Sequence, residues 1–306
     1  MQTGNVPPGA AAGDGHGHRN AMSARGWQEI GWNGISLLVP GSWHPAVILE
    51  SYLLFEEDYR PVFEIRWQQG RGRFPARRLL RKLERSLGEA RIDPWQPPAD
   101  WLAALSGCQV HGFRWRQAEA GGRGLLFHNP ATGRSVLLRF HLDQAANAAY
   151  CARVVGSLYE QPPAGDHTWA VFDIRARLPA RMRLAGQRFL PGSYAIDFRQ
   201  DHLLVSLLRF KPAEELLRGR SLADFGDHLA QGAALVPGSA PDTATWQDGG
   251  SAARRLLRRL QRKKAYHQLI LWHVPEKNVI LGLRVKSNRP IPPSRVRTIR
   301  EGYIAL

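Results

Sequence analysis

Two distant stretches of the 306-residue chain have the same layout. Residues 125–140 read LLFHNPATGRSVLLRF and residues 269–285 read LILWHVPEKNVILGLRV, each with two apolar runs around a polar turn. His128 stands 145 positions before His273, and Arg139 stands 145 positions before Arg284. Two unrelated hairpins would have no reason to share one offset. The pattern therefore predicts that the chain contains two copies of one unit.

Further landmarks follow in the same order in both halves. An alternating apolar pattern that stops at a proline, typical of a half-buried strand, occurs at 35–40 and again at 174–179. A helix is predicted at 75–87 from a leucine face, and another at 221–231 from a capping-box start. The aligned landmarks are Pro40 with Pro179, Tyr52 with Tyr194, Arg66 with Arg209, and Trp101 with Trp246.

Each copy reads as three strands, a helix, a Pro/Gly-rich connection, three more strands and a final helix. Strands joined by hairpins, with helices in two places, predict an α+β class: two tandem copies of a mostly antiparallel sheet flanked by helices. We expect a disordered tail at 1–25, which is rich in Gly, Ala and Pro. The predicted repeats cover 26–161 and 168–306, because EQPPAGDH at 160–167 breaks regular structure.

The order of these elements resembles the PsbP-like fold. The resemblance rests on the strand that leads from Ile35 through Pro40 to Trp43, and on the closing segment Val154-Val155-Gly156-Ser157-Leu158. The second copy departs from it, with Met182 or Arg183 opposite Trp43 and a different closing segment at 299–303. The family includes the photosystem II protein PsbP, a Ran-binding transport factor and DcrB-type lipoproteins. The resemblance implies a sandwich fold and a binding module, and it carries over no functional residue.

Composition indicates a globular protein with an anionic partner. Hydrophobic residues make up 43% of the chain, whereas 42 Lys and Arg against 26 Asp and Glu give a net charge of +16. Such a charge favours nucleic acid, acidic proteins or anionic lipid. Two cysteines are too few for a disulfide framework or a cysteine-based zinc site. With no apolar run of membrane-spanning length and no secretion signal, the sequence predicts a soluble cytoplasmic protein.

The two copies differ most in where their positive charge lies. The first copy has a basic run at 71–85, on the helix face opposite the leucines, and the second has one at 254–264. Residues 253–263 have helical periodicity but align with the predicted strand at 108–115, so both a strand and a helix remain open. So many cations must face solvent or a partner. The predicted anion- or partner-binding residues are Arg77, Arg78, Arg81, Lys82, Arg85, Arg254, Arg255, Arg258, Arg259, Arg262, Lys263 and Lys264.

The sequence offers no recognisable catalytic or cofactor motif. Nucleophile-elbow, zinc-protease, phosphate-loop and paired C-x-x-C patterns do not occur. His128 and His273 recur in both copies beside a proline turn, but no carboxylate recurs at a fixed spacing from either. We therefore predict that both histidines are structural, with a ring nitrogen bonded to turn backbone. Arg139 and Arg284 are predicted to pair with a carboxylate or to line a sheet face.

These observations favour a non-catalytic binding, adaptor or assembly protein without cofactor or metal, whose partner is a protein. The alternative is a nucleic-acid-associated protein that contacts the phosphate backbone through 71–85 and 254–264. In that case Trp67, Trp115 or Trp272 would serve for base stacking if exposed. An unrecognised enzyme is the third possibility. The duplication, the basic runs and the aromatic residues are each open to a structural test.

Overall fold

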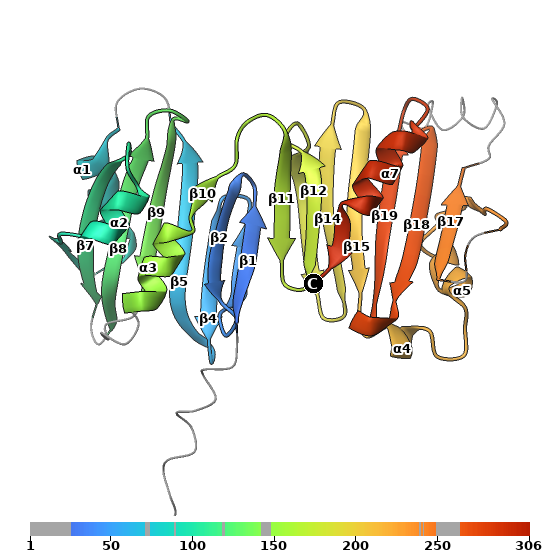
Figure 1. Cartoon of the computed structure of the whole chain (residues 1–306), viewed down its shortest axis with the longest axis horizontal. Coiled ribbons are helices and arrows are strands. Elements are labelled where there is room, and N and C mark those ends of the chain that lie inside the picture. Colours follow the sequence, from blue (N-terminus) through green and yellow to red (C-terminus); the bar gives the residue numbers. More distant parts are fainter. Residues whose placement is uncertain are drawn as a thin grey trace, which may run out of the picture.

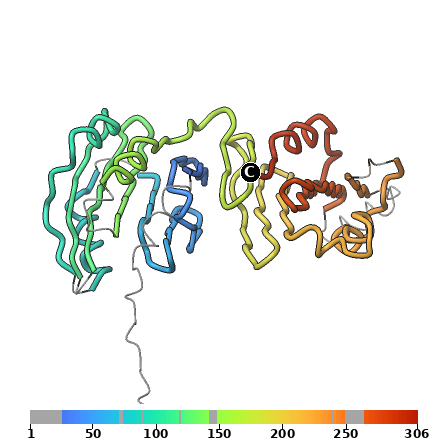
Figure 2. Tube along the Cα trace, turned by 60° about the horizontal axis from the view of Figure 1, so that its bottom comes forward, coloured from blue at the N-terminus to red at the C-terminus, as the bar shows by residue number. Residues whose placement is uncertain are grey.

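The computed structural model describes residues 26–70, 74–88, 90–117, 120–141, 148–238, 240, 242–248 and 264–306. The predicted disordered tail at 1–25 lies outside these residues. Three antiparallel sheets follow one another along the long axis of the molecule, and the two halves of the sequence occupy its opposite ends (Figures 1 and 2). Strands hold 52% of the described residues and helices 19%. The predicted α+β class is therefore wrong, because the fold is dominated by sheets and the copies share one of them.

The first outer sheet belongs to the first half of the chain. Its strand order is β3-β4-β5-β9-β8-β7-β6, antiparallel throughout. The helices of this half lie on both of its faces (Figure 1). In chain order the strands are β3 (His44–Leu49), β4 (Tyr52–Glu57), β5 (Arg60–Gln69), β6 (Arg91–Pro94), β7 (Gln109–Gln117), β8 (Ala120–Asn129) and β9 (Arg134–Phe140).

The second outer sheet repeats this arrangement with strands of the second half. Its order is β13-β14-β15-β19-β18-β17-β16, so every strand has a counterpart at the same place in the first sheet. The equivalence expected from the duplicated sequence thus appears in the strand order. In chain order the strands are β13 (Arg183–Leu190), β14 (Ser193–Gln200), β15 (Leu203–Phe210), β16 (Ala234–Leu235), β17 (Thr243–Gln247), β18 (Tyr266–Val274) and β19 (Val279–Ser287).

A central sheet joins the halves, which the sequence did not predict. Its order is β10-β2-β1-β11-β12-β20, three strands from each half. The junction pairs Gly31 with Ala170, and these residues are related by the same 139-residue offset that separates β1 from β11. Equivalent residues that face each other indicate a pseudo-two-fold axis, as in an isologous dimer. The strands are β1 (Trp27–Trp32), β2 (Ile35–Pro40), β10 (Tyr159–Glu160), β11 (Asp166–Val171), β12 (Ile174–Pro179) and β20 (Tyr303–Ala305).

This junction removes two exposed strand edges. Without it, β1 and β11 would each leave a row of backbone donors and acceptors open to other chains. A Cβ on Gly31 would lie 2.6 Å from the carbonyl oxygen of Thr168, so glycine permits the close approach. The side chain of Gln161 adds three hydrogen bonds: it accepts from Thr168 N (2.6 Å) and donates to the carbonyls of Thr168 (3.0 Å) and Ile35 (3.2 Å). The junction is therefore closed by backbone pairing and by one buried amide.

The hydrophobic core runs through both halves. The largest cluster contains Trp32, Trp43 and Phe63 from the first half together with Trp169 and Phe198 from the second. The helices α2 (Ala99–Ala104) and α3 (Ala148–Gly156), and in the second half α7 (Pro293–Glu301), contribute to this cluster. Continuity of the core explains why the repeats are not separate sandwiches.

Two further helices cover the opposite faces of the outer sheets. Helix α1 (Ala76–Ser86) packs its leucine face on Phe113 and Trp115, as the apolar spacing predicts. Helix α5 (Leu222–Asp227), preceded by the single turn α4 (Ala213–Leu216), packs Phe225 on Trp246. The predicted capping box between Ser221 and Asp224 is confirmed, with both hydrogen bonds present.

Part of the predicted alignment between the copies is wrong. Trp101 lies in α2, whereas Trp246 lies in β17 opposite Leu269, the position that Phe113 holds opposite Gly124 in the first copy. The second copy has no described helix at the place of α2, so the shared offset of the two tryptophans is accidental. The alignment of 254–264 with 108–115 fails for the same reason, because β17 takes the place of β7 before the basic run begins.

Candidate anion-binding groove

Five basic residues of the first run lie on the exposed face of α1, whereas Arg71 and Arg73 of the same run lie outside the described residues. Arg77, Arg78, Arg81, Lys82 and Arg85 all have exposed side chains, while Leu79, Leu80 and Leu83 turn toward the sheet. Among the described residues none of the five cations forms an ion pair, and Arg85 donates only to the carbonyl of Arg81 on the same helix (3.4 Å). Helix α1 thus presents five cations without a neutralising partner.

The second basic run is mostly outside the described residues. Arg254, Arg255, Arg258, Arg259, Arg262 and Lys263 belong to this undescribed part, and Lys264 is described as half-buried just before β18. The choice between strand and helix for 253–263 stays open. The run follows β17 and precedes β18, so the order of the chain places it in the connection that corresponds to the β7–β8 turn of the first copy.

A groove of 640 Å³ lies beside α1 at the free edge of the first outer sheet. Arg77, Arg81 and Glu84 line one wall, so its net charge is +1, and Leu80, Ile92, Val110, Leu102 and Phe113 supply apolar surface. The segment 95–97 forms the other wall, and it crosses β7 so closely that a Cβ on Gly112 would lie 2.4 Å from the carbonyl oxygen of Trp95. The groove has the size of a ligand site and combines apolar walls with two unpaired guanidinium groups.

The sequence reading missed the far wall of this groove. Residues 94–97 read PWQP and looked like a connection between elements. In the structure Trp95 packs edge-on against Trp101, with ring centroids 5.5 Å apart, and Arg123 lies over its ring at 5.4 Å. A tryptophan between two prolines was the available signal, because such a segment is stiff and aromatic.

Two of the three tryptophans named for base stacking are buried, and the third is half-buried. Trp67 and Trp115 are 4% and 3% exposed. Trp272 is half-buried and packs edge-on against Tyr303, with ring centroids 5.6 Å apart and Arg300 over the ring at 5.5 Å. Sequence-independent binding of single strands relies on exposed aromatic faces, and Trp67 and Trp115 do not meet this condition.

The two recurrent histidines have different surroundings. His128 is 7% exposed, stacks on Phe74 and lies with Nδ1 3.1 Å from the hydroxyl of Ser135 on β9. The predicted bond from a ring to turn backbone is wrong, since His128 faces a side chain. The backbone N–H of His273 donates to the carbonyl of Asp242 (2.9 Å), while its Nε2 has no hydrogen-bond partner among the described residues. The two copies therefore have a histidine at the same position of the repeat but surround it differently.

Arg139 belongs to a buried polar cluster and pairs with a carboxylate, which was one of the two predicted alternatives. Its guanidinium forms an ion pair with Glu64 and lies over the ring of Trp115 at 4.9 Å, and the two charged side chains are 12% and 10% exposed. The hydroxyl of Tyr52 donates to Glu64 (2.7 Å), and burial raises the pKa of Tyr52 well above its usual value. Arg284 instead donates to the carbonyl of Leu229 (3.2 Å), because Ser206 is its cross-strand neighbour.

His141 adjoins this cluster and should make stability depend on pH. Its ring meets Trp115 edge-on at 5.1 Å, and burial, followed by the charge of Arg139, lowers its pKa to about 4. Between pH 6.5 and 4 the unfolded chain therefore binds the proton that the folded state excludes, so stability falls as the pH falls. We expect His141→Gln to remove about 2 kcal/mol of the stability difference between pH 7 and pH 4, allowing for solvent screening of the partly buried ring.

Urea unfolding of the wild type and the variant at both pH values would measure this effect. His44→Gln is the control, because His44 is exposed on β3. It should keep the wild-type pH dependence. An equal pH dependence in all three proteins would contradict the burial of His141.

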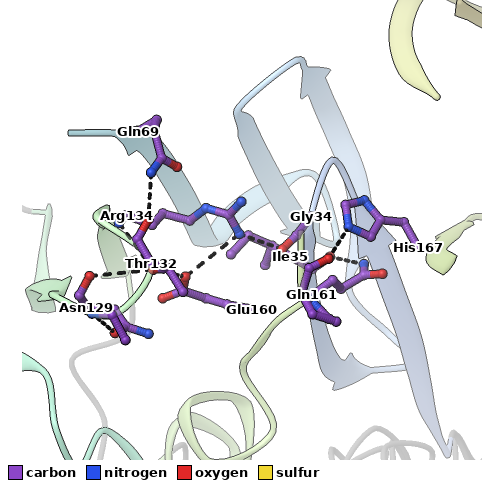
Figure 3. A network of polar contacts seen from close by, with 11 residues as sticks. Gly34, Ile35, Gln69, Asn129, Thr132, Arg134, Glu160, Gln161 and His167 are labelled. Carbon is purple, nitrogen blue, oxygen red and sulfur yellow. Dashed lines mark hydrogen bonds and ion pairs between the residues drawn. The ribbon is translucent and has the colours of Figure 1, made fainter. Parts of the chain in front are cut away.

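A polar network ties the turn between β8 and β9 to the inter-copy linker (Figure 3). Arg134 donates to the carbonyl of Gly34 (2.6 Å), and the hydroxyl of Thr132 donates to Glu160 (2.6 Å). Gln69 donates to the carbonyl of Thr132 (2.6 Å), and His167 Nε2 lies 2.8 Å from the carbonyl of Pro162. These contacts fix the linker on the first copy, and we assign them a structural role.

The described part of the chain was also searched for metal ligands, reactive thiols and membrane-spanning helices. No group of three or more His, Cys, Asp or Glu side chains there could hold a metal ion. Cys108 and Cys151 are free, and burial raises the pKa of both thiols, that of Cys151 to about 12. None of the helices within the described ranges has the length and apolar character needed to span a membrane.

Comparisons with known proteins do not assign a family. No family model matches the sequence, and no curated protein matches it. A crystal structure from Bacteroides thetaiotaomicron VPI-5482 is similar at 12% identity and a TM-score of 0.29 over 47% of this chain, which spans about half (49%) of that protein. The immunity protein TplEi of the T6SS from Pseudomonas aeruginosa is similar at 13% identity and a TM-score of 0.33, over 93% of this chain and 99% of that one. Scores this low establish no shared fold or function.

Proposed function

We propose that the protein is a non-catalytic binding protein that holds an acidic, partly apolar segment of a partner protein in the groove beside α1. The observation that carries the proposal is that one groove combines an apolar floor with two arginines, Arg77 and Arg81, which form no ion pair among the described residues. A carboxylate-bearing segment would neutralise the arginines, and its apolar side chains would cover the floor. The free thiols Cys108 and Cys151 are compatible with the cytoplasm, which we include in the proposal.

The groove favours recognition by side chains over strand addition. β6 is an edge strand, but it has only four residues and ends at Pro94, which lacks a backbone donor. Short, proline-containing edges resist pairing with another strand. Specificity would therefore come from the two guanidinium groups and the apolar pockets, in the way that a few anchors dominate an interface.

Nucleic acid fits this site less well than protein. A phosphate backbone would use the cations of α1 but leave the apolar floor uncovered. Trp67 and Trp115 are buried, and Trp272 is half-buried against Tyr303. The PsbP-like resemblance remains part of the proposal, because its implied role as a binding module agrees with a groove that lacks a catalytic arrangement among the described residues.

Selection of peptides from a displayed random library tests the proposed function. Peptides that combine acidic and apolar residues should be enriched on the wild type. We expect the double variant R77E/R81E to bind the enriched peptides at least about tenfold more weakly at low salt, because two attractive charges become repulsive. A tenfold loss of affinity corresponds to only about 1.4 kcal/mol of binding free energy.

The matched control is R78E/R85E, which makes the same change of charge on the same helix but outside the groove. It should change binding by no more than about threefold, through the long-range field alone. The proposal would be contradicted if both variants weakened binding equally, or if the wild type enriched no acidic peptide. Duplex DNA retained by the wild type at 150 mM salt and lost equally in both variants would favour the nucleic-acid alternative.

A further inference from the structure

A second charged pocket lies in the other half of the molecule. It has a volume of 790 Å³ and is lined by Arg181, Arg183 and Arg199, with Gln200, Asp201 and Pro163 of the linker. Arg183 and Arg199 are directly opposite each other on β13 and β14. This arginine pocket is independent of the groove beside α1, and no part of the proposed function depends on it.

The charges of the arginine pocket are not neutralised by the protein. Within the described ranges none of the three arginines forms an ion pair, and all three side chains are exposed. Like charges directly opposite on neighbouring strands destabilise a sheet. Gln200 is held in place from the other side, because Arg295 of α7 donates to its side-chain oxygen. The cluster is therefore a cost to the folded state unless a ligand offsets it.

The first copy shows that the fold does not need these arginines. In both copies the register shifts at one residue of the first strand, after Pro45 in one copy and after Leu184 in the other. The second pair before this shift is His44 opposite Glu56 in the first copy and Arg183 opposite Arg199 in the second.

Two neighbouring positions support the same alignment. Trp43 N donates to the carbonyl of Pro40, and Met182 N donates to the carbonyl of Pro179. Met182, and not Arg183, is therefore the residue of the second copy that corresponds to Trp43. Arg181 therefore corresponds to Ser42. Thus one copy has a serine, a histidine and a glutamate where the other has three arginines, and a shared folding requirement cannot explain the difference.

We propose that the arginine pocket binds a phosphoryl group, either on a small soluble molecule or on a phospholipid headgroup. The pocket residues carry three positive charges and one negative charge, from Asp201, which matches a phosphomonoester near its dianionic state. Guanidinium groups donate two parallel hydrogen bonds to phosphate, and three of them can surround its three terminal oxygens. A single carboxylate would balance only half of this net charge of +2.

Calorimetric titration of the full chain with inorganic phosphate and with glycerol 3-phosphate tests this proposal, with acetate at equal ionic strength as the reference anion. We expect saturable binding of both phosphates and none of acetate. The variant R183H/R199E places the first-copy residues in the pocket, so the sheet can accommodate them, and it should reduce phosphate affinity at least about tenfold.

The control R177H/R188E makes the same substitutions on β12 and β13 outside the pocket and should bind phosphate like the wild type. Phosphatidylcholine vesicles with and without phosphatidic acid separate the two sources: binding only to the vesicles with phosphatidic acid, lost in R183H/R199E, indicates a headgroup ligand. Absence of binding to every phosphate probe would overturn the proposal, as would equal binding by R183H/R199E and R177H/R188E. Neither result would affect peptide binding at α1.

Discussion

Replacing Glu64 with alanine should lower the free energy of unfolding by about 4 kcal/mol, because removing one partner of a buried ion pair leaves the other charge uncompensated. Arg139 of β9 would remain only 12% exposed, over the ring of Trp115, and would lose its carboxylate partner on β5. Tyr52 would also lose the acceptor of its hydroxyl. Urea denaturation at neutral pH measures the change directly.

Glu29→Ala is the control for this prediction. Glu29 pairs with Arg175 at 3.2 Å, but both side chains are about one-third exposed, so the loss should stay below about 1 kcal/mol. Equal effects of the two substitutions would mean that Glu64 and Arg139 are solvated, contrary to their burial in the structure. A double variant, Glu64→Leu with Arg139→Met, should recover much of the stability, because the uncompensated charge is removed as well.

Gly31→Val should destabilise the protein by about 3 kcal/mol through the junction of the two halves. The added Cβ would meet the carbonyl oxygen of Thr168 at 2.6 Å and its carbonyl carbon at 3.0 Å, so the two strands must separate. Valine otherwise favours strands, so loss of strand propensity cannot produce the effect. The measurement is urea unfolding followed by both intrinsic fluorescence and circular dichroism.

Gly26→Val provides the matched comparison, because no atom lies within 4 Å of a Cβ at Gly26. This control should retain wild-type stability. If Gly31→Val also left the free energy of unfolding unchanged, β1 and β11 would not pair as described, and the two halves would not share a central sheet. A separate early transition in the variant would instead show that the junction opens before the outer sheets unfold.

The sequence predicted the parts of the fold that depend on local pattern. Alternating residues such as Ile35 and Leu37 predicted strands, the leucines of α1 predicted a helix, and Ser221 with Asp224 predicted a cap. These features depend on side-chain period and local hydrogen bonding, which a single chain displays directly. The equal strand order of the two outer sheets follows from the same repeated pattern.

The central sheet could not be predicted in this way. Its joining contact relies on the small size of Gly31, and its outer strands β10 and β20 have two and three residues. Such short strands carry no period, and the residues that pair across the junction are 139 positions apart. The fold class was therefore wrong, although most of the strands were predicted at the right places.

The sequence predicted the cations of the candidate site but not the rest of the groove. The cations of α1 were visible because five of them face away from the leucines, but Trp95 and Ile92 were not, since the groove forms only when β6 and its following segment fold back beside the helix. The shared offset of Trp101 and Trp246 was also misleading, because α2 and the loop that follows it in the first copy are matched in length by the longer connection between β17 and β18 in the second. The repeat instead revealed the arginine pocket, by showing where the copies differ.

Hydrogen–deuterium exchange of the whole protein, with and without the most enriched acidic peptide, tests the proposed binding site most directly. Amides slow down where a ligand covers or stabilises the backbone, so the footprint locates the site without a substitution. The groove beside α1 predicts slower exchange in 76–86 and 91–97, absent when R77E/R81E replaces the wild type. Protection confined to other segments, such as 183–201, or unchanged exchange at saturating peptide, would contradict it.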